Sequence, residues 1–492
     1  MWGLTASGCL GPQDLLGYRY SLLSSIATGG MNNVICLIPS RNVSENEHFP
    51  QDDADFIKQW LAWTDDNVDL LTRMAPIAAW GRPGPGKADG NLAVINNTGV
   101  AFLFNPSARP INKSIALDST WRFNCSSEMT FNITELVPQQ ATRATVACGG
   151  AFDVTIPATT AMVLSMEPIK AHTEPRLVGA AGSAELEGST LHLRGVEGES
   201  GTAAALEVRW HEPEGGGPVT RAADIRRVTV NGAAAGAFDA STAEGQRLHR
   251  VKLQGRFDGP RFRHNQEIGT MPSDFAGGAW SGVFNVPQAV MTQLKQRNAS
   301  YPIRWGAAES AVPWLVPGRL LAFVKYTPLV NDTLDITAAS VDDTPVLMRK
   351  AYNTIVRSPG RFIGWFADLT ALVKPGTKQT LRLTLPQIST DFAFRQGFIT
   401  AGSDLGKGNM SLADAKTHCN HLKGCAGFTF RNAQCGGKCP AAGDSEVITD
   451  IMFKATSQGN PSPTWCAYAK PPRIDGVFFE NVETLKSTAF TV

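Results

Sequence analysis

The stretch FDVTIPATTAMVLSMEP, Phe152–Pro168, decides the fold class, because two apolar, β-favouring runs flank the turn residues Pro-Ala-Thr-Thr. Short runs of this kind, bounded by turn residues, are typical of β-strands. The neighbouring stretches NLAVINNTGVAFLFNPS (91–107) and TRATVACGG (142–150) repeat the pattern. Together they predict a β-sandwich over residues 81–170, after the Gly/Pro-rich linker GRPGPGKADG.

The β pattern continues beyond this sandwich. Short strands and the tight turn of VTVNG (228–232) predict a small Ig-like β-domain over residues 171–244. Longer strands that are richer in aromatic residues, such as RLLAFVKYTP (319–328), predict a jelly roll from residue 245 to residue 390. The chain is therefore expected to be mainly β and to have several domains.

The end of the chain suggests that the jelly roll is interrupted. The strands pause near Gln387, and PPRIDGVFFENVE (471–483) supplies the kind of final strand that the jelly roll still needs. We assign residues 471–492 to the jelly roll and residues 391–470 to a small disulfide-rich α+β insertion in one of its loops. The hypothesis requires residues 471–492 to pair with jelly-roll strands.

Residues 1–80 have a different pattern. MWGLTA (1–6) and VICLIP (34–39) are apolar strand signals, and helical stretches follow each of them, the second with Phe56, Trp60 and Trp63 on one stripe. Strand–helix repeats indicate parallel pairing, and a (β/α)8 barrel needs about 250 residues. We therefore expect the C-terminal part of such a barrel, and a chain that begins inside a domain.

Composition excludes some functions and points to a cell compartment. The formal charge of +1 over 492 residues suggests neither nucleic acid nor an anionic membrane as a partner, and no apolar run is long enough for a membrane span. The first thirty residues do not resemble a signal peptide, which we attribute to truncation. Eight N-x-S/T sequons nevertheless predict an extracellular or secretory-pathway glycoprotein. The sequons begin at Asn42, Asn96, Asn112, Asn124, Asn132, Asn298, Asn331 and Asn409.

The nine cysteines favour disulfides over metal binding. Five lie close together near the C-terminus, while Cys9 and Cys36 equally fit buried thiols. Cys435 and Cys439 match zinc spacing poorly, so no metal and no cofactor are predicted. The disulfide candidates are Cys125, Cys148, Cys419, Cys425, Cys435, Cys439 and Cys466.

Three parts of the chain resemble known families. GCLGPQDLLGYRYSLLSSIATGGMNNVICLIPSR with WLAWTDDNVDLL and IPATTAMVL resembles the barrel end and following β-domain of α-galactosidase-like glycoside hydrolases, over roughly residues 1–170. Residues 245–390 resemble the galactose-binding-like jelly rolls appended to such enzymes. SLADAKTHCNHLKGCAGFTFR with IMFK and TWCAYAK looks like an apple-type (PAN-like) module, although Cys435 and Cys439 depart from its expected pattern.

The hydrolase resemblance implies a pair of carboxylates at strand ends. Asp14, after the first predicted strand, is the one catalytic candidate, but it directly precedes a helical apolar run, which favours a helix N-cap over a catalytic role. Arg41 follows VICLIP and is a candidate for holding sugar, or for a contact with the acidic stretch after it. As encoded, the chain is expected to lack the catalytic pair, and no P-loop, nucleophile elbow or HExxH motif is present.

Sugar binding outside a barrel uses exposed aromatic rings and planar polar groups. Trp280 in GGAWSG and Trp305 in IRWGAAES have glycine or loop surroundings, and Arg319 is a polar neighbour; the alternative for each tryptophan is the core. The leading hypothesis is a secreted glycoside-hydrolase-like protein that acts by binding glycans. The alternatives are an active α-galactosidase-like glycosidase with an N-terminal part that is missing here, and an apple-domain protein-interaction or adhesion molecule.

Overall fold

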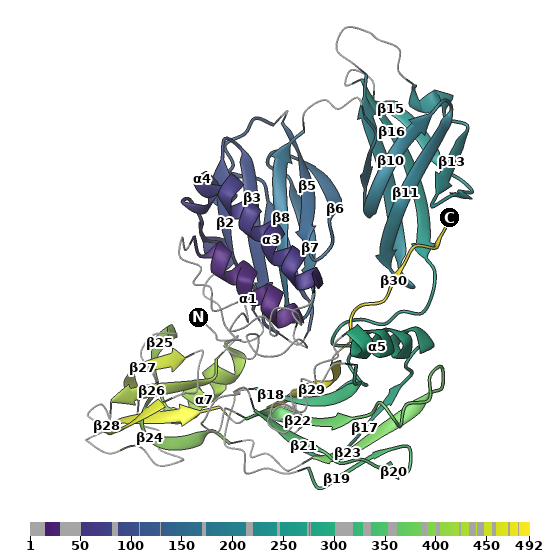
Figure 1. Ribbon diagram of the computed structural model, residues 1–492. Coiled ribbons are helices and arrows are strands. Elements are labelled where there is room, and N and C mark those ends of the chain that lie inside the picture. Colours follow the sequence, from purple (N-terminus) through teal and green to yellow (C-terminus); the bar gives the residue numbers. More distant parts are fainter. Residues whose placement is uncertain are drawn as a thin grey trace, which may run out of the picture.

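The structure, a computed structural model, confirms that the chain is mainly β and contains several sheets (Figure 1). It contains no closed barrel among the residues that it describes. The described residues are 15–29, 51–80, 87–107, 109–127, 129–169, 174–212, 220–243, 247–272, 275, 277–300, 318–327, 336–352, 362–385, 391–399, 404–422, 425–431, 439, 447–454, 459–470, 473–480 and 482–492.

The first sandwich packs a large sheet against a two-stranded one. Its core lies between them and includes Leu103, Ile115, Phe131 and Met162. In order across the large sheet, its strands are β1 (Ala75–Pro76), β2 (Asp89–Ile95), β3 (Thr98–Asn105), β8 (Thr160–Pro168), β5 (Thr130–Val137) and β6 (Ala141–Ala147). The small sheet pairs β4 (Ile111–Ala116) with β7 (Ala151–Ile156), and the short helices are η1 (Ala78–Trp80) and η2 (Ser119–Trp121).

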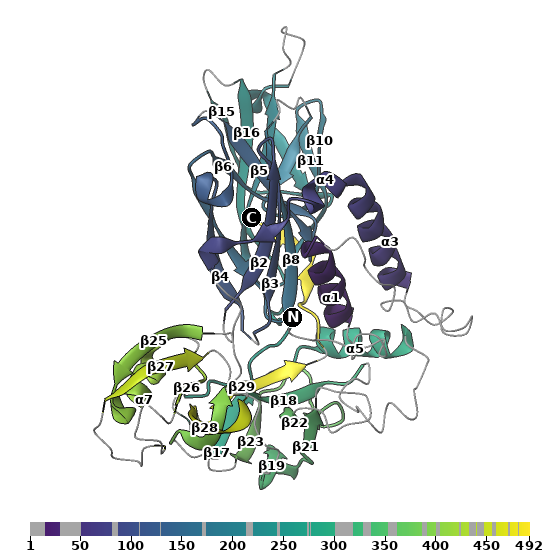
Figure 2. The ribbon, with the colours of Figure 1, turned by 90° about the vertical axis from the view of Figure 1, so that its left-hand side faces the viewer.

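Helices cover the other face of the large sheet (Figure 2). They are α1 (Leu15–Ala27), α3 (Gln51–Asp66) and α4 (Val68–Leu71). The predicted stripe on residues 51–66 is present, but its partner is the sandwich: Trp60 is buried and its ring lies 5.8 Å from that of Phe102 on β3. The predicted strands 1–6 and 34–39 lie outside the described residues.

The second sandwich continues the large sheet, since Thr142 of β6 pairs with Val178 of β9. Its larger sheet contains β9 (Arg176–Val178), β12 (Ala203–His211), β16 (Leu248–Phe257) and β15 (Asp239–Ala243). The facing sheet contains β10 (Ala181–Glu187), β11 (Thr190–Glu199), β13 (Arg227–Val230) and β14 (Ala233–Ala234), with the short helix η3 (Ala222–Asp224) nearby. β16 pairs with β12 along its whole length, so placing residues 248–257 in the jelly roll was wrong.

The third sandwich packs two four-stranded sheets around a core that includes Trp280, Val324, Trp365 and Leu383. One sheet has the order β17 (Gly278–Phe284), β23 (Gln379–Leu385), β19 (Ala338–Val341), β20 (Thr344–Pro345). The other has the order β21 (Arg349–Tyr352), β22 (Phe362–Asp368), β18 (Leu321–Thr327), β29 (Arg473–Glu480), and α5 spans Gln288–Ser300. β29 pairs with β18, which is the pairing that the insertion hypothesis requires.

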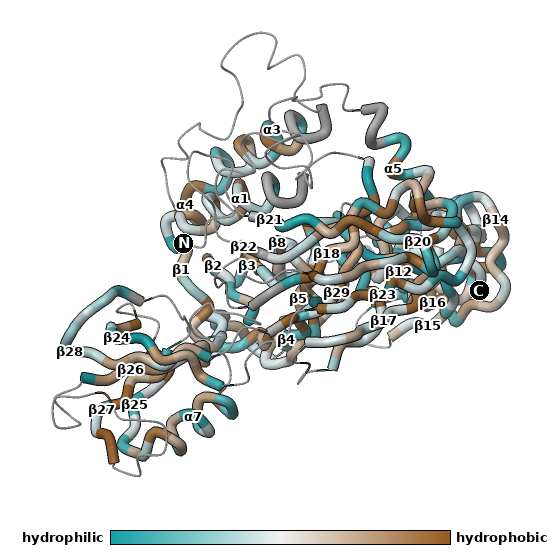
Figure 3. Tube along the Cα trace, turned by 90° about the horizontal axis from the view of Figure 1, so that it is seen from below, coloured by the Kyte–Doolittle hydropathy of each residue, from teal (hydrophilic) through white to brown (hydrophobic). Residues whose placement is uncertain are grey.

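A five-stranded antiparallel sheet lies between β23 and β29 in the chain, and with its helix it lies to one side of the other modules (Figure 3). Its order is β24 (Ala393–Ile399), β28 (Gly459–Ala469), β26 (Gly427–Arg431), β27 (Ile448–Lys454), β25 (Asp404–Met410). The helix α7 (Leu412–His421) begins at Ser411, whose hydroxyl caps it by accepting the Asp414 N–H. Phe428 and Phe430 of β26 fill the core against this helix.

The last residues, 482–492, run from the third sandwich to the second (Figure 1). We call them the C-terminal segment. Its strand β30 (Lys486–Ser487) pairs with β11, and its strand β31 (Phe490–Thr491) pairs with β16. The segment therefore runs back from the third sandwich to the second, which precedes it in the sequence.

Candidate functional site

The structure places the predicted sugar-binding residues in different surroundings. Trp280 lies within β17, is only 7% exposed and packs in the core of the third sandwich, so the expectation that its glycines put it in a loop was wrong. Arg319 is described and half-exposed. Asp14, Arg41 and Trp305 lie outside the described residues, so their predicted roles stay predictions.

Arg319 belongs to an ion pair at the end of two strands. Its Nη1 donates to Asp368 Oδ2 at 2.6 Å, and the other oxygen of Asp368 accepts the Thr370 hydroxyl at 2.6 Å. Burial alone would raise the pKa of Asp368, but the hydrogen bonds from Thr370 and Arg319 outweigh it and hold that pKa below its ordinary value. Asp368 therefore stays ionised and does not supply a proton.

A second carboxylate lies two strands away on the same face. Leu321 of β18 pairs with Asp368 on one side and with Glu480 on the other, so both carboxylates project to the face of Leu321. Glu480 forms an ion pair with Lys325. Glycoside hydrolysis needs one carboxyl that is protonated, and Asp368 stays ionised. The two carboxylates therefore form two structural ion pairs, Arg319–Asp368 and Lys325–Glu480.

A different surface, on the five-stranded sheet, brings an aromatic ring and polar groups together. On β24, Gln396 pairs with Cys466 of β28, but the next residue, Gly397, pairs with Pro461. Moving one residue along β24 thus corresponds to moving five residues along β28, and residues 462–465 form a large bulge. Bulges of this kind re-aim side chains and are common beside binding sites.

Trp465 is the last residue of this bulge and is half-buried. The guanidinium of Arg431, its partner across the β26–β28 ladder, lies over the indole at 5.3 Å, and the ring of Phe398 lies 6.0 Å away. The next residue, Cys466, forms a disulfide with Cys439. The tryptophan is therefore fixed in orientation by a stacked cation, a second ring and a neighbouring covalent cross-link.

Polar side chains complete the bulge. Gln396 Nε2 donates to the carbonyl of Pro463 at 3.3 Å, and the hydroxyls of Ser462 and Thr464 lie 3.2 Å apart at the surface. We call Trp465, Arg431, Phe398, Gln396 and these two hydroxyl residues the bulge site. Sequence reasoning missed it, although prolines at 461 and 463 are a signal, because proline within a strand pattern indicates an edge or a bulge.

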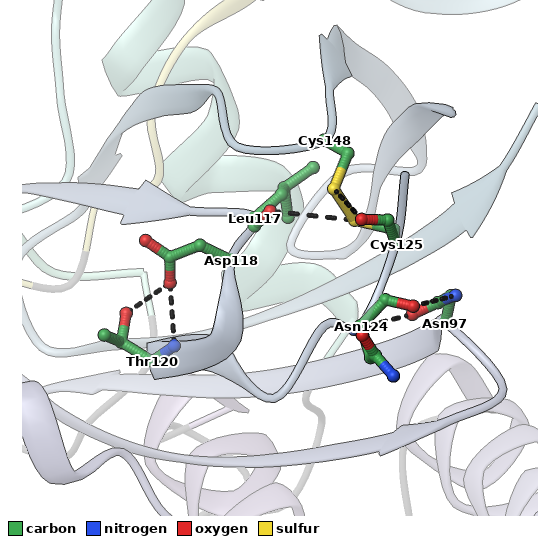
Figure 4. The surroundings of a disulfide bond; sticks show 7 residues. All are labelled: Asn97, Leu117, Asp118, Thr120, Asn124, Cys125 and Cys148. Carbon is green, nitrogen blue, oxygen red and sulfur yellow. Dashed lines mark hydrogen bonds between the residues drawn. A yellow bond between two sulfur atoms is a disulfide. The ribbon is translucent and has the colours of Figure 1, made fainter. Parts of the chain in front are cut away.

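Three disulfides are present among the described residues, all between predicted candidates. Cys125–Cys148 closes the loop before β5 in the first sandwich, beside reciprocal hydrogen bonds between Asn97 and the backbone of Asn124 (Figure 4). The other two, Cys419–Cys425 and Cys439–Cys466, lie in the five-stranded unit. Cys9, Cys36 and Cys435 lie outside the described residues.

The predicted sequons are distributed over several surfaces. Of those with described side chains, Asn132 is half-buried on β5, and the exposed ones are Asn96, Asn112, Asn124 and Asn409. Asn42, Asn331 and the side chain of Asn298 lie outside the described residues. Glycosylation stays a prediction. No described helix is both long and apolar enough to cross a membrane.

Comparisons with known proteins give no family. No protein-family model and no curated protein matches the chain. Among solved structures, an α-galactosidase from Saccharomyces cerevisiae with raffinose is 9% identical over 20% of this chain and 32% of that chain, with a TM-score of 0.16. α-Galactosidase I from Mortierella vinacea is 14% identical over 33% and 37%, with a TM-score of 0.21.

An isomalto-dextranase from Arthrobacter globiformis T6 complexed with panose is 9% identical over 75% of this chain and 46% of that chain, with a TM-score of 0.19. The chain spans less than half the length of each of these three proteins. Superpositions with TM-scores this low carry no argument about the fold or the activity of the chain.

Proposed function

We propose that the chain is an extracellular carbohydrate-binding protein and that the bulge site holds the sugar. The observation that carries the proposal is Trp465, a half-buried indole that is held at the surface by Arg431 and Phe398. The apolar face of a pyranose packs against such a ring, while its hydroxyls need planar polar partners at the rim.

The polar groups of the bulge site suit this chemistry. A guanidinium has five N–H donors, and the amide of Gln396 and the hydroxyls of Ser462 and Thr464 both donate and accept. Sugar hydroxyls also do both. The three disulfides and the four exposed sequons support an extracellular location, because disulfides persist in oxidising compartments.

We propose binding rather than hydrolysis for the described part of the chain. Asp368 and Glu480 are both held in ion pairs, so neither is suited to act as a general acid. An α-galactosidase-like activity stays a prediction about a longer protein. Our assignment of the five-stranded unit to the apple-type (PAN-like) modules, and of the third sandwich to the galactose-binding-like jelly rolls, is also a proposal.

A glycan array with the full chain, followed by calorimetry on the best ligand, tests the proposal. Trp465→Ala is expected to weaken binding about tenfold or more, which corresponds to roughly 1.4 kcal/mol. Phe394→Ala is the matched control, because Phe394 is the one aromatic side chain among the strongly exposed apolar residues of the described chain and lies on the same sheet. It should bind normally.

Two results would count against the bulge site. A wild-type array without a single bound glycan would refute carbohydrate binding, and capture of a protein partner by the same preparation would favour the protein-interaction alternative. Equal losses in Trp465→Ala and Phe394→Ala would show that the sheet, rather than the site, had been damaged.

A further inference from the structure

A partly buried polar cluster joins the first and third sandwiches. We call it the junction cluster, and it comprises Thr159, His264, Asn265, Lys325 and Glu480. Thr159 lies in the turn before β8, His264 and Asn265 lie between β16 and β17, and Glu480 ends β29. Hydrogen bonds connect these distant parts of the chain. These hydrogen bonds can therefore form only when the two sandwiches are docked.

His264 uses both ring nitrogens in this cluster. Its Nδ1 lies 2.9 Å from the carbonyl oxygen of Val482, which can only accept, so Nδ1 carries a proton. Its Nε2 lies 2.8 Å from the hydroxyl oxygen of Thr159. Whether Nε2 also carries a proton depends on what that hydroxyl does.

The orientation of the Asn265 amide determines which way the Thr159 hydroxyl donates. With the amide nitrogen toward Glu480, that nitrogen lies 2.9 Å from each carboxylate oxygen, and the amide oxygen lies 2.7 Å from Oγ1 of Thr159 and 3.2 Å from Nε2 of His264. Each amide atom then has suitable partners. The Thr159 hydroxyl donates to the amide oxygen, so it accepts from Nε2, and the imidazole donates from both nitrogens.

A neutral His264 does not fit the same arrangement. Its Nε2 would need a donor, so the Thr159 hydroxyl would turn toward it and the Asn265 amide would rotate to donate to Thr159. The amide oxygen would then face the carboxylate of Glu480, placing two acceptors together in a site where Asn265 is only 5% exposed. Loss of one proton thus breaks the hydrogen-bond pattern as far as β29.

The backbone makes the docked state sensitive to that loss. Thr159 has φ +46° and Asn265 has φ +53°, in the left-handed region, which is especially unfavourable for a β-branched residue. Such conformations persist where surrounding interactions hold them. Here the hydrogen bonds of the cluster and the bond from the Thr159 N–H to the Ser107 carbonyl, 2.9 Å, hold the turn.

We propose that the junction cluster is a proton-dependent latch between the first and third sandwiches, closed when His264 is doubly protonated. The closed state keeps this proton to a higher pH than the open state, so the latch is fully stabilised at acidic pH. That stabilisation falls as the pH rises above about 6.5, the ordinary pKa of a free histidine. This inference does not depend on carbohydrate binding.

The other charged groups around the cluster are compatible with a doubly protonated His264. Glu480 forms an ion pair with Lys325, and the Arg109–Glu267 pair, 2.7 Å, lies at its edge and also connects the two sandwiches. Arg263 is bound by Glu199, and Glu483 lies between Val482 and Thr484, which both hydrogen-bond to His264. Arg263, the neighbour of His264 in the chain, is thus balanced by a carboxylate of its own, and Glu480 stands two hydrogen bonds from the ring.

Hydrogen exchange of the full chain between pH 5 and pH 8 tests the latch. The readout is the amide exchange of residues 158–160, corrected for the intrinsic rise with pH. Because one proton is released on opening, the open fraction should rise by up to tenfold per pH unit above about pH 6.5, until the closed state loses its proton as well. His264→Gln, which cannot take up the proton, should remove this dependence.

His192→Gln is the matched control, since His192 bonds Thr229 in the second sandwich at 2.9 Å and takes no part in the cluster. It should keep the wild-type profile. A wild-type exchange rate that does not change with pH beyond the intrinsic effect would overturn the proposal, and this result needs no variant to fold. Ring 15N shifts that show a neutral His264 at pH 5.5 would overturn it as well.

Discussion

Replacing Phe490 with alanine is expected to loosen the C-terminal segment from the second sandwich. The Phe490 ring lies 5.2 Å from that of Phe257, edge to face, and it rests on Gly255, where an added Cβ would lie 2.7 Å from the ring. Truncating a fully buried phenylalanine costs about 3–5 kcal/mol. Because Phe490 is only partly buried, we expect roughly 2 kcal/mol, which is about a 30-fold larger opening equilibrium.

Hydrogen exchange at Asp258 measures this opening directly, because its N–H donates to the Ala489 carbonyl of the C-terminal segment at 2.9 Å, beside the pairing of β31 with the end of β16. Protection of the Asp258 amide should fall by about the same factor of 30, while the five-stranded sheet stays unchanged. Val492→Ala is the control and should alter protection less than about twofold, since Val492 is exposed. Unchanged protection in Phe490→Ala would refute the reasoning, because the segment would then not be packed in solution.

Three further predictions concern pH, a cross-link and a close approach. Burial lowers the pKa of His249, although the nearby Glu212 carboxylate opposes this, so the unfolded chain takes up the proton at a higher pH than the folded chain. The stability of the second sandwich should therefore fall as the pH drops below about 6.5, measured as the urea midpoint at pH 8 and pH 5. Replacing Cys125 and Cys148 by serine opens a loop with a sequence separation of 23 and should cost about 3 kcal/mol in the same assay, and an unchanged midpoint would contradict it. Gly364→Ala should lower the melting temperature by several degrees, because its Cβ would lie 2.0 Å from a carbonyl oxygen of β18 at a φ of +147°.

Much of the β architecture could be predicted from the sequence, because alternation and turn residues are local signals. Phe428 and Phe430 fill a core against α7, the helix that precedes them, within the small α+β unit that the sequence predicted. Strand partners are not local. β16 has the same kind of alternation as the strands after it, and only its register with β12 places it in the second sandwich.

The candidate site also depended on strand pairing that the sequence did not predict. The glycines around Trp280 suggested a loop, but Gly282 serves close packing: its Cβ would lie 2.4 Å from the Ile268 carbonyl and 2.5 Å from the Trp280 ring. Glycine in a strand often marks such an approach. Trp465 could have been found from the flanking prolines, whereas Arg431 and Phe398 reach it only through strand pairing.

The return of the chain to the third sandwich at β29 has a consequence for biosynthesis. β18 lies between β22 and β29, but β29 leaves the ribosome about 150 residues after β18. At about 5–20 residues per second, the central strand waits on the order of ten seconds or more with one edge open. During that interval the five-stranded unit can fold and close its disulfides. The yield of folded protein should therefore depend on chaperones that shield an exposed strand edge, more than on the final stability of any sheet.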